Sequence, residues 1–351
     1  MPNIFRSPDL FLSHFDSLAG AVLGLGEAQF IRIDQAKLRE LAFLDHRELR
    51  LPVVLSLPLD ELCIQAASAA SQHSFRMIYH SAFCCSTYLA RCLEATGVGR
   101  TLKEPYALTQ LSFYHADESF EQFEHPADWE QLLRGAVDFL SRPPESSVLP
   151  IIKSHNFSII LAPAIARLFS GRLRSLFIYS DLRSFLVSTL KSRERRDFVH
   201  MLLKLMSPAK ADRLGIPAHD PAGMTDGVAA AYCWLLHMAC YEAAANQAGR
   251  SGMRSLDCQL LLEQPLETIT SIAEYLGRDV PRDRLLAGLE DEGLKQHAKN
   301  PGQVFSGERR KAELQTQGFR FRKEVAEATR WFDALPLKDS LRGPASLPLI
   351  N

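Results

Sequence analysis

The chain has 351 residues, a length that fits one large domain or two small ones. Its hydrophobic content of 46% and charged content of 23% are those of an ordinary globular protein. The formal net charge is −1, which gives no indication of a nucleic-acid or membrane-surface partner.

The cysteines, the N-terminal residues and the lengths of the apolar runs further limit the kind of protein that this sequence can be. Seven cysteines are scattered along the chain, and Cys92, Cys233 and Cys240 fall within apolar helical patterns. This is typical of reduced thiols, and no set has zinc-ligand spacing, so no metal is expected. The N-terminus lacks a signal-peptide pattern, and no apolar run is long enough to span a membrane. We therefore expect a cytoplasmic protein.

Residues 1–72 are predicted to form a helical N-terminal extension that packs on a main domain of residues 73–351. Helical patterns occur near 28–44 and 59–71, and a break separates them over 51–58.

From residue 75 onward, short apolar runs alternate with helical patterns. Strands are predicted at Phe75–Tyr79, Val148–Ile152, Leu173–Tyr179 and Met253–Leu256. The helices between and after them are predicted at Ser86–Ala95, Ala107–Tyr114, Trp129–Ser141, Ile159–Phe169, Asp181–Lys191, Thr225–Asn246 and Pro265–Leu276. This alternation predicts a three-layer α/β domain around a mostly parallel sheet, with the ligand site at the carboxyl ends of the strands.

The segment from Phe75 to Glu94 has the pattern of a phosphate-binding loop. A strand runs into small and polar residues, and Ser86 and Thr87 then open a helix. Free N–H groups at a helix N-terminus, together with the positive end of the helix dipole, hold an anion. The Gly-Lys-[Ser/Thr] of nucleotide triphosphatases is absent. The competing interpretation is an ordinary helix with Ser86 as its N-cap.

Between about residue 75 and about residue 311 the chain resembles the P-loop sulfotransferases, particularly their bacterial members. Residues 81–89 are similar to the family loop that ends in Gly-[Ser/Thr]-Thr-x-Leu. In the family this loop holds the phosphosulfate of the donor, 3′-phosphoadenosine 5′-phosphosulfate (PAPS). The resemblance implies that the donor is bound by Ser81, Cys84, Cys85, Ser86 and Thr87.

Four later segments follow the family order. Residues 102–106 are similar to a segment where some members place a catalytic glutamate, here Glu104. Residues 176–188 resemble the element that binds the donor's 3′-phosphate, with Ser188 in its helix. Residues 256–277 resemble a late strand and helix of the family. Residues 299–301 with Arg309, Arg310 and Lys311 resemble the basic C-terminal loop that closes on the nucleotide.

The chain departs from the family pattern at three positions. Phe83 stands where many members have Lys or Arg, Cys85 replaces the loop glycine, and Ser180 takes the place of the arginine that begins the 3′-phosphate element. Arg183, one turn before Val187-Ser188, is the candidate substitute for that arginine, and Lys153 or residues 309–311 are further sources of positive charge.

Sulfuryl transfer needs an aligned acceptor, stabilisation of the charge on the leaving phosphate, and a base for the acceptor's proton. Lys153 ends a buried strand and is a candidate for the charge; the alternative is a surface lysine. Glu104 is the leading base, against a surface pair with Lys103, and His155 is the alternative base, against a structural histidine. Ser188 is either a donor ligand or a small core residue.

The sequence therefore predicts a PAPS-dependent sulfotransferase that needs no metal and acts on a hydroxyl or amine of a small-molecule, glycan or peptide acceptor. Residues 106–147 and 193–225 are the expected walls of the acceptor pocket. One alternative is a non-catalytic nucleotide-binding protein with the same fold. Another is a cysteine phosphatase, because Cys85 and Arg91 have Cys-x5-Arg spacing, although the residues between them have a helical pattern.

Overall fold

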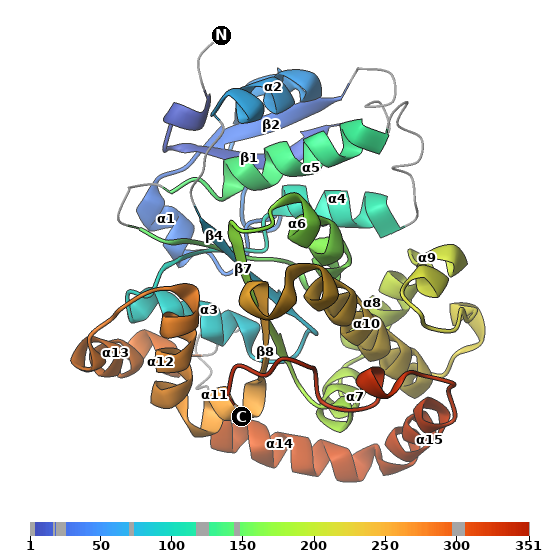
Figure 1. Cartoon of the computed structure of the whole chain (residues 1–351). Coiled ribbons are helices and arrows are strands. Elements are labelled where there is room, and N and C mark those ends of the chain that lie inside the picture. The colour runs from blue at the N-terminus through green and yellow to red at the C-terminus, as the bar shows by residue number, and fades with distance from the viewer. Residues whose placement is uncertain are drawn as a thin grey trace.

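A five-stranded parallel sheet forms the centre of the computed structural model, which describes residues 4–16, 18, 26–69, 74–116, 126–143, 148–296 and 306–350 (Figure 1). The strand order is β5-β6-β4-β7-β8, and each neighbouring pair is parallel. The strands are β4 (Phe75–His80), β5 (Arg100–Lys103), β6 (Pro150–Lys153), β7 (Leu173–Tyr179) and β8 (Met253–Asp257). The predicted α/β class with a parallel central sheet is confirmed.

The four predicted strands are all present, within two residues at each end, and one strand was missed. β5 has only four residues, and two of them, Arg100 and Lys103, are charged yet buried. A short strand with this composition has no apolar run by which the sequence could reveal it. It forms one edge of the sheet and pairs with β6 from Arg100↔Pro150 to Lys103↔Lys153.

Both faces of the sheet are covered, because the side chains of each strand alternate between two apolar cores. Met77 faces one core and Ile78 the other, and Phe177 and Ile178 divide in the same way. The first core is completed by α4 (Tyr106–Ala116), α5 (Pro126–Leu140), α6 (Ala162–Leu168) and α10 (Asp226–Gly252), and the second by α3 (Ser86–Ala95), α12 (Pro265–Leu276) and α13 (Arg282–Leu289). The result is the predicted three-layer arrangement.

Six more helices in the described part of the chain follow β7. They are α7 (Leu182–Leu190), α8 (Arg193–Lys204), α9 (Pro208–Arg213), α11 (Cys258–Glu263), α14 (Gly307–Arg320) and α15 (Arg322–Asp333). Helix α14 crosses the base of the view in Figure 1, near α11 and α7, and α15 packs on α10. Among the described residues, no helix is both long and apolar enough to cross a membrane.

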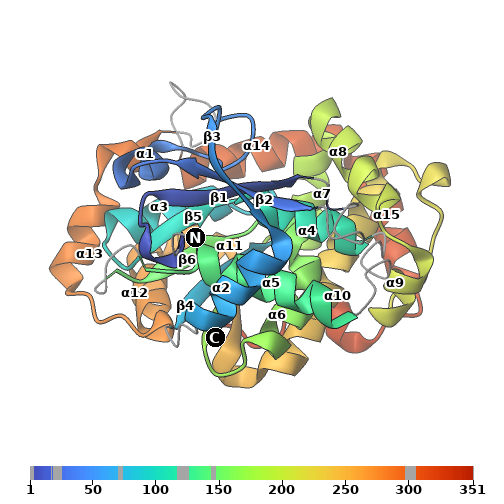
Figure 2. The same cartoon turned by 90° about the horizontal axis from the view of Figure 1, so that it is seen from above.

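The prediction of a wholly helical N-terminal extension is wrong. This region contains a second, antiparallel sheet of β1 (Leu10–Asp16), β2 (Glu27–Arg32) and β3 (Val53–Pro58), with helices α1 (Gln35–Glu40) and α2 (Leu59–Ala69). The first five residues of the helix predicted over 28–44 therefore belong to strand β2, and the predicted break over 51–58 contains β3. Hydrogen bonds to neighbouring strands stabilise β2 and β3 as strands. The periodicity of apolar residues along the sequence does not reveal these partners. Seen from above in Figure 2, this sheet lies in front of the central one, and it packs on α4 and α5.

Candidate anion-binding and catalytic site

The loop between β4 and α3 has an unusual backbone. Ala82, Phe83 and Cys85 have φ angles of 66°, 52° and 62°, in the left-handed region that L-residues rarely adopt. Each such residue costs about 1–3 kcal/mol, so the surrounding structure must hold the loop in this form. The N-cap of α3 is Cys85, which makes no side-chain capping bond. The interpretation of Ser86 as the N-cap is therefore wrong.

This backbone leaves a row of amides available at the start of α3. Among the described residues, none accepts a hydrogen bond from the backbone N–H groups of residues 83–87. Successive N–H groups in a mixed left- and right-handed turn form a concavity that binds anions, and the helix dipole adds to it. Ser86 and Thr87, at the first turn, are each only 6% exposed. The loop therefore has the backbone geometry that an anion-binding loop requires, and its binding of a phosphate stays a prediction.

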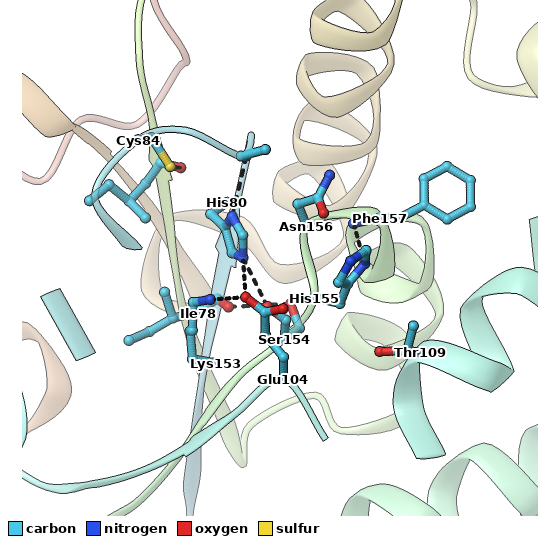
Figure 3. Close-up of polar contacts among 12 residues, drawn as sticks. Ile78, His80, Cys84, Glu104, Thr109, Lys153, Ser154, His155, Asn156 and Phe157 are labelled. Atoms are coloured by element: carbon cyan, nitrogen blue, oxygen red, sulfur yellow. Dashed lines mark hydrogen bonds and ion pairs between the residues drawn. The ribbon is translucent and has the colours of Figure 1, made fainter. Parts of the chain in front are cut away.

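A buried ion pair lies at the carboxyl ends of the neighbouring strands. The ammonium of Lys153, the last residue of β6, donates to Oε1 of Glu104, the residue after β5 (Figure 3). Lys153 is completely buried and Glu104 is 6% exposed. Glu104 also has a positive φ, 59°. The structure therefore brings two of the predicted catalytic residues together, and it holds one of them in a strained conformation.

His80, which the sequence analysis missed, completes this cluster. Its Nε2 lies 3.8 Å from Oε1 of Glu104 and 3.0 Å from the carbonyl oxygen of Ser154. Its Nδ1 accepts a hydrogen bond from the N–H of Ala82 at 3.2 Å, so the proton of the neutral ring is on Nε2. His80 thus ties the anion loop to the Glu104–Lys153 pair. The sequence offered no distinctive signal for it, because the predicted strand ended one residue earlier, at Tyr79.

His155, the alternative base, has a structural role. Its Nδ1 accepts a hydrogen bond from the N–H of Phe157 at 3.3 Å and caps the 3₁₀ helix Asn156–Leu161. Its ring packs edge-on against Phe113 and Phe198, and in Figure 3 it turns towards Phe157. Glu104 remains the better candidate, because it lies beside Lys153 and the loop.

A basic pocket adjoins the anion loop between α7, α11 and α14. Its volume is about 340 Å³, and its lining includes Arg183, Arg310 and Lys311, three predicted donor-binding residues. Arg310 joins the pocket to the loop, because one of its NH groups donates to the carbonyl oxygen of Phe83 at 2.7 Å. The pocket also contains Asp181 and Asp257. Burial raises the pKa of Asp257 above its ordinary value, which favours the neutral form.

The predicted basic loop is in fact the first turn of helix α14. Ser306 caps this helix by accepting a hydrogen bond from the N–H of Arg309. The same turn directs Arg310 and Lys311 to the pocket, while Arg309 is exposed and is not part of its lining. Residues 299–301 lie outside the described part of the chain.

Ser188, the predicted 3′-phosphate ligand, is 1% exposed on the buried face of α7. This burial agrees with the alternative of a small core residue. Its carbonyl oxygen accepts a hydrogen bond from Arg195 at 2.7 Å. Ser180, at the position of the family arginine, is equally buried, and its hydroxyl has no partner among the described residues.

Positive charge reaches the Phe83 position from other elements. The guanidinium of Arg195, on α8, lies 4.5 Å from the centre of the Phe83 ring, a cation–π distance, and Arg310 binds the carbonyl of the same residue. Burial lowers the pKa of Arg195, although its neighbours include Glu313. Arg195 and Arg310 therefore bring positive charge to Phe83 from α8 and α14, and sequence order alone did not indicate these contacts.

The cysteines of the loop differ from one another. Cys84 is fully buried and donates to the carbonyl oxygen of Ile178 at 3.2 Å, and burial raises its pKa to about 11. A hydrogen bond from Cys258 and the positive charge of Arg310, acting against burial, lower the pKa of the Cys85 thiol to about 7. Ser81 is also buried, and its N–H donates to Ile178.

The phosphatase alternative requires Arg91 to fold over the loop. Instead, α3 carries Arg91 away, and its guanidinium donates to the carbonyl oxygens of Gly293 and Gln296. A Cys-x5-Arg site with the arginine over the anion is therefore not formed.

Comparisons with known proteins found similar chains among the solved structures, and these include sulfotransferases. No protein-family profile and no curated protein matches this chain. The sulfotransferase domain from the curacin biosynthetic pathway has 12% identity and a TM-score of 0.41, covering 79% of this chain and 99% of that one. The sulfotransferase domain of the Synechococcus PCC 7002 olefin synthase has 13% identity and a TM-score of 0.39, covering 71% and 94%.

Two further solved structures are similar at the same level. Sulfotransferase STF9 from Mycobacterium avium has 8% identity and a TM-score of 0.38, covering 78% of this chain and 80% of that one. The mouse sulfotransferase SULT7A1, solved with 3′-phosphoadenosine 5′-phosphate (PAP), has 10% identity and a TM-score of 0.32, covering 78% and 92%. At these values the likeness carries no functional argument, and any function must be argued from the site.

Proposed function

We propose that this protein is a PAPS-dependent sulfotransferase that acts on a hydroxyl or amine acceptor. The observation that carries the proposal is the position of the buried Glu104–Lys153 ion pair beside the open amides at the start of α3. Burying a charged pair and straining Glu104 both cost stability. Groups of this kind, placed next to an anion-binding loop, are typical of a catalytic site.

The residues present fit PAPS as the donor. The amides of residues 83–87 offer hydrogen bonds for a phosphosulfate, and the adjoining pocket of about 340 Å³ offers Arg183, Arg310 and Lys311 for the second phosphate. Arg310 lies at the junction of the two regions. A donor with charged groups at both ends matches this division better than a mononucleotide with one phosphate chain.

When bound, PAPS supplies the sulfuryl group. Glu104 is the base in this proposal, because an ionised carboxylate next to the loop can accept the proton of the acceptor hydroxyl. Lys153, whose ammonium donates to this carboxylate, provides positive charge near the phosphate that leaves. His80 holds the anion loop in place relative to the Glu104–Lys153 pair, because its ring nitrogens bond to Ala82 in the loop and to Ser154 after β6.

An assay of PAP release tests the proposal. The full-length protein is incubated with PAPS and a panel of phenols, alcohols and amines, and acceptor-dependent PAP is quantified by chromatography. Parallel reactions contain ATP with the same acceptors, or p-nitrophenyl phosphate alone. Acceptor-dependent release of PAP supports the proposal. Hydrolysis of p-nitrophenyl phosphate or phosphate transfer from ATP, without reaction of PAPS, contradicts it.

A further inference from the structure

We propose that a turn in the N-terminal region, residues 42–49, is a positioning element of the candidate catalytic site, and that it holds Glu104 in the conformation that pairs it with Lys153. The proposal rests on the proposed function in one respect, which is that Glu104 acts as the base. The contacts that carry it do not depend on that function. They come from a part of the chain that precedes the resemblance to the sulfotransferases.

Glu104 needs support from its surroundings to keep its conformation. Its φ of 59° lies in the left-handed region, and the next residue, Pro105, favours a negative φ in the residue before it. A residue of this kind persists only where the surrounding structure determines its backbone. One support is the central sheet, because the N–H of Glu104 donates to the carbonyl oxygen of Lys153 at 2.6 Å. Pro105 has no N–H and contributes no such bond.

The second support is the backbone of Leu44, which bonds on both sides of Glu104. The N–H of Leu44 donates to the carbonyl oxygen of Lys103 at 2.8 Å. The carbonyl oxygen of Leu44 accepts a hydrogen bond from the N–H of Tyr106 at 3.0 Å. Leu44 is completely buried, so water does not compete for these bonds. One residue of the turn therefore fixes the chain just before and just after Glu104.

Side chains fasten the N-terminal region to the same two places. The ammonium of Lys103, which is 2% exposed, donates to the carbonyl oxygen of Arg39 at 2.6 Å. The rings of His46 and Tyr106 lie 5.3 Å apart in an edge-to-face arrangement. Lys103 is the last residue of β5 and Tyr106 is the first residue of α4. The contacts thus reach the ends of both elements that flank Glu104.

Two carboxylates give the turn its shape. Oε2 of Glu48 accepts a hydrogen bond from the N–H of Ala42 at 2.9 Å, which ties the end of the turn to its beginning. Asp45 accepts hydrogen bonds from the N–H of Arg47 at 2.9 Å and from its Nε at 2.8 Å. Leu44 lies inside the segment that these bonds close. Glu48 is therefore the side chain whose loss should loosen the turn around Leu44.

Loosening the turn should impair the base more than it impairs binding. Glu104 would lose one of its two supports, and its carboxylate would move relative to Lys153. A displacement of about 1 Å in a catalytic site can lower a rate by roughly a hundredfold. The amides of residues 83–87 and the basic pocket, which would bind PAP, are formed by later parts of the chain. A positioning role therefore predicts a fall in kcat without a matching loss of PAP affinity.

Steady-state kinetics of full-length variants test this role, with PAPS and the acceptor that releases the most PAP. We expect Glu48→Ala to lower kcat by tenfold or more, while the KM for PAPS and the PAP affinity stay within twofold. Glu48→Gln, which keeps an acceptor oxygen, should recover most of the kcat. Gln65→Ala is the matched control, because it removes a hydrogen bond from the N–H of Ile4 elsewhere in the N-terminal region.

A double variant shows whether Glu48 acts through Glu104. In the Glu104→Gln background, Glu48→Ala should change kcat by less than twofold, because no base remains to be positioned. An equal fold-loss in the two backgrounds overturns the proposal. So does an equal loss in Gln65→Ala, since any weakening of the N-terminal region would then have the same effect.

Hydrogen exchange resolved to single residues tests the contacts without turnover. In Glu48→Ala, the amides of Glu104 and Tyr106 should exchange at least tenfold faster than in the wild type. The amide of Ile152, inside β6, should keep its rate and so show that the sheet is intact. Unchanged exchange at Glu104 and Tyr106 overturns the proposal. If the wild type releases no PAP with any acceptor, the proposed function fails, and the support of Glu104 by the turn is judged by exchange alone.

Discussion

Two buried polar clusters lie near the end of strand β6, and they differ in charge. The first joins His80, Glu104 and Lys153 through an ion pair. The second is centred on the ring of His237. Its Nε2 lies 3.3 Å from the side-chain amide nitrogen of Asn156, and its Nδ1 lies 2.6 Å from the carbonyl oxygen of Cys233. The second cluster is neutral: burial, followed by the nearby His155, lowers the pKa of His237 to about 4, although its hydrogen bonds oppose this.

The difference separates a structural cluster from a functional one. In the neutral cluster each ring nitrogen of His237 has a partner, so burial costs little. In the charged cluster two ions are buried, Glu104 has a φ of 59°, and the open amides of the loop lie alongside. Stability gives no reason to keep that arrangement, since buried ion pairs are often no better than apolar replacements.

Glu104→Gln should lower turnover by roughly 10²–10⁴, the usual contribution of a general base, while PAP affinity stays within a few-fold. Glutamine keeps the shape of the side chain but cannot take a proton. Turnover is measured as PAP release from PAPS, at a temperature where circular dichroism shows the variant folded. Glu94→Gln is the matched control, because Glu94 pairs at 3.3 Å with Lys103 of β5 but lies outside the candidate site. Equal losses in the two variants would remove Glu104 from catalysis.

Lys153→Met should lower the free energy of unfolding by about 3–5 kcal/mol, because the buried Glu104 carboxylate loses its cation. Asn156→Ala in the neutral cluster should cost less, about 1–3 kcal/mol. Urea unfolding curves give both values. The double variant Lys153→Met with Glu104→Gln should recover part of the loss. If Lys153→Met costs no more than Asn156→Ala, the two clusters do not differ as we describe.

His237 should make the protein sensitive to acid. The ring stays neutral in the folded protein down to a pKa of about 4, against 6.5 for an ordinary histidine. Below pH 6.5 the unfolded chain therefore binds a proton that the folded protein does not. This contribution is complete above pH 6.5, and stability falls by roughly 1.4 kcal/mol per pH unit as the pH drops from 6.5 towards 4. In urea unfolding across this range, His237→Gln should show a slope smaller by that amount. Parallel curves for the two proteins would rule out the buried neutral ring.

Arg183→Gln should produce the smallest effect, a two- to fivefold loss of PAP affinity that shrinks as salt increases, equivalent to about 0.5–1 kcal/mol. Arg183 is exposed at the edge of the pocket, where water screens its charge. Arg193→Gln is the control, because Arg193 is exposed on α8 outside this pocket. A loss that is the same at low and high salt would argue against a phosphate contact.

Local patterns predicted the strands, the loop and the first helix of the central sheet, because these elements are continuous and apolar. They did not predict β5 of this sheet, nor β1, β2 and β3 of the N-terminal sheet, because these strands depend on hydrogen bonds to partner strands. The resemblance supplied Glu104, but its pairing with Lys153 joins residues 49 positions apart and depends on the order of strands in the sheet. His80 was missed because a strand-terminal histidine has no distinctive pattern. The burial of Ser188 followed from which face of α7 meets the core, a tertiary property.

The central claim is that the open amides of α3 and the basic pocket bind one donor with two separate phosphate groups. Titration calorimetry of the reduced full-length protein with PAP, ADP and ATP tests it most directly. We predict one PAP site per chain, with ADP and ATP at least tenfold weaker because they lack the 3′-phosphate that Arg183, Arg310 and Lys311 would bind. PAP binding that is absent at millimolar ligand, or no tighter than ADP binding, would contradict the account.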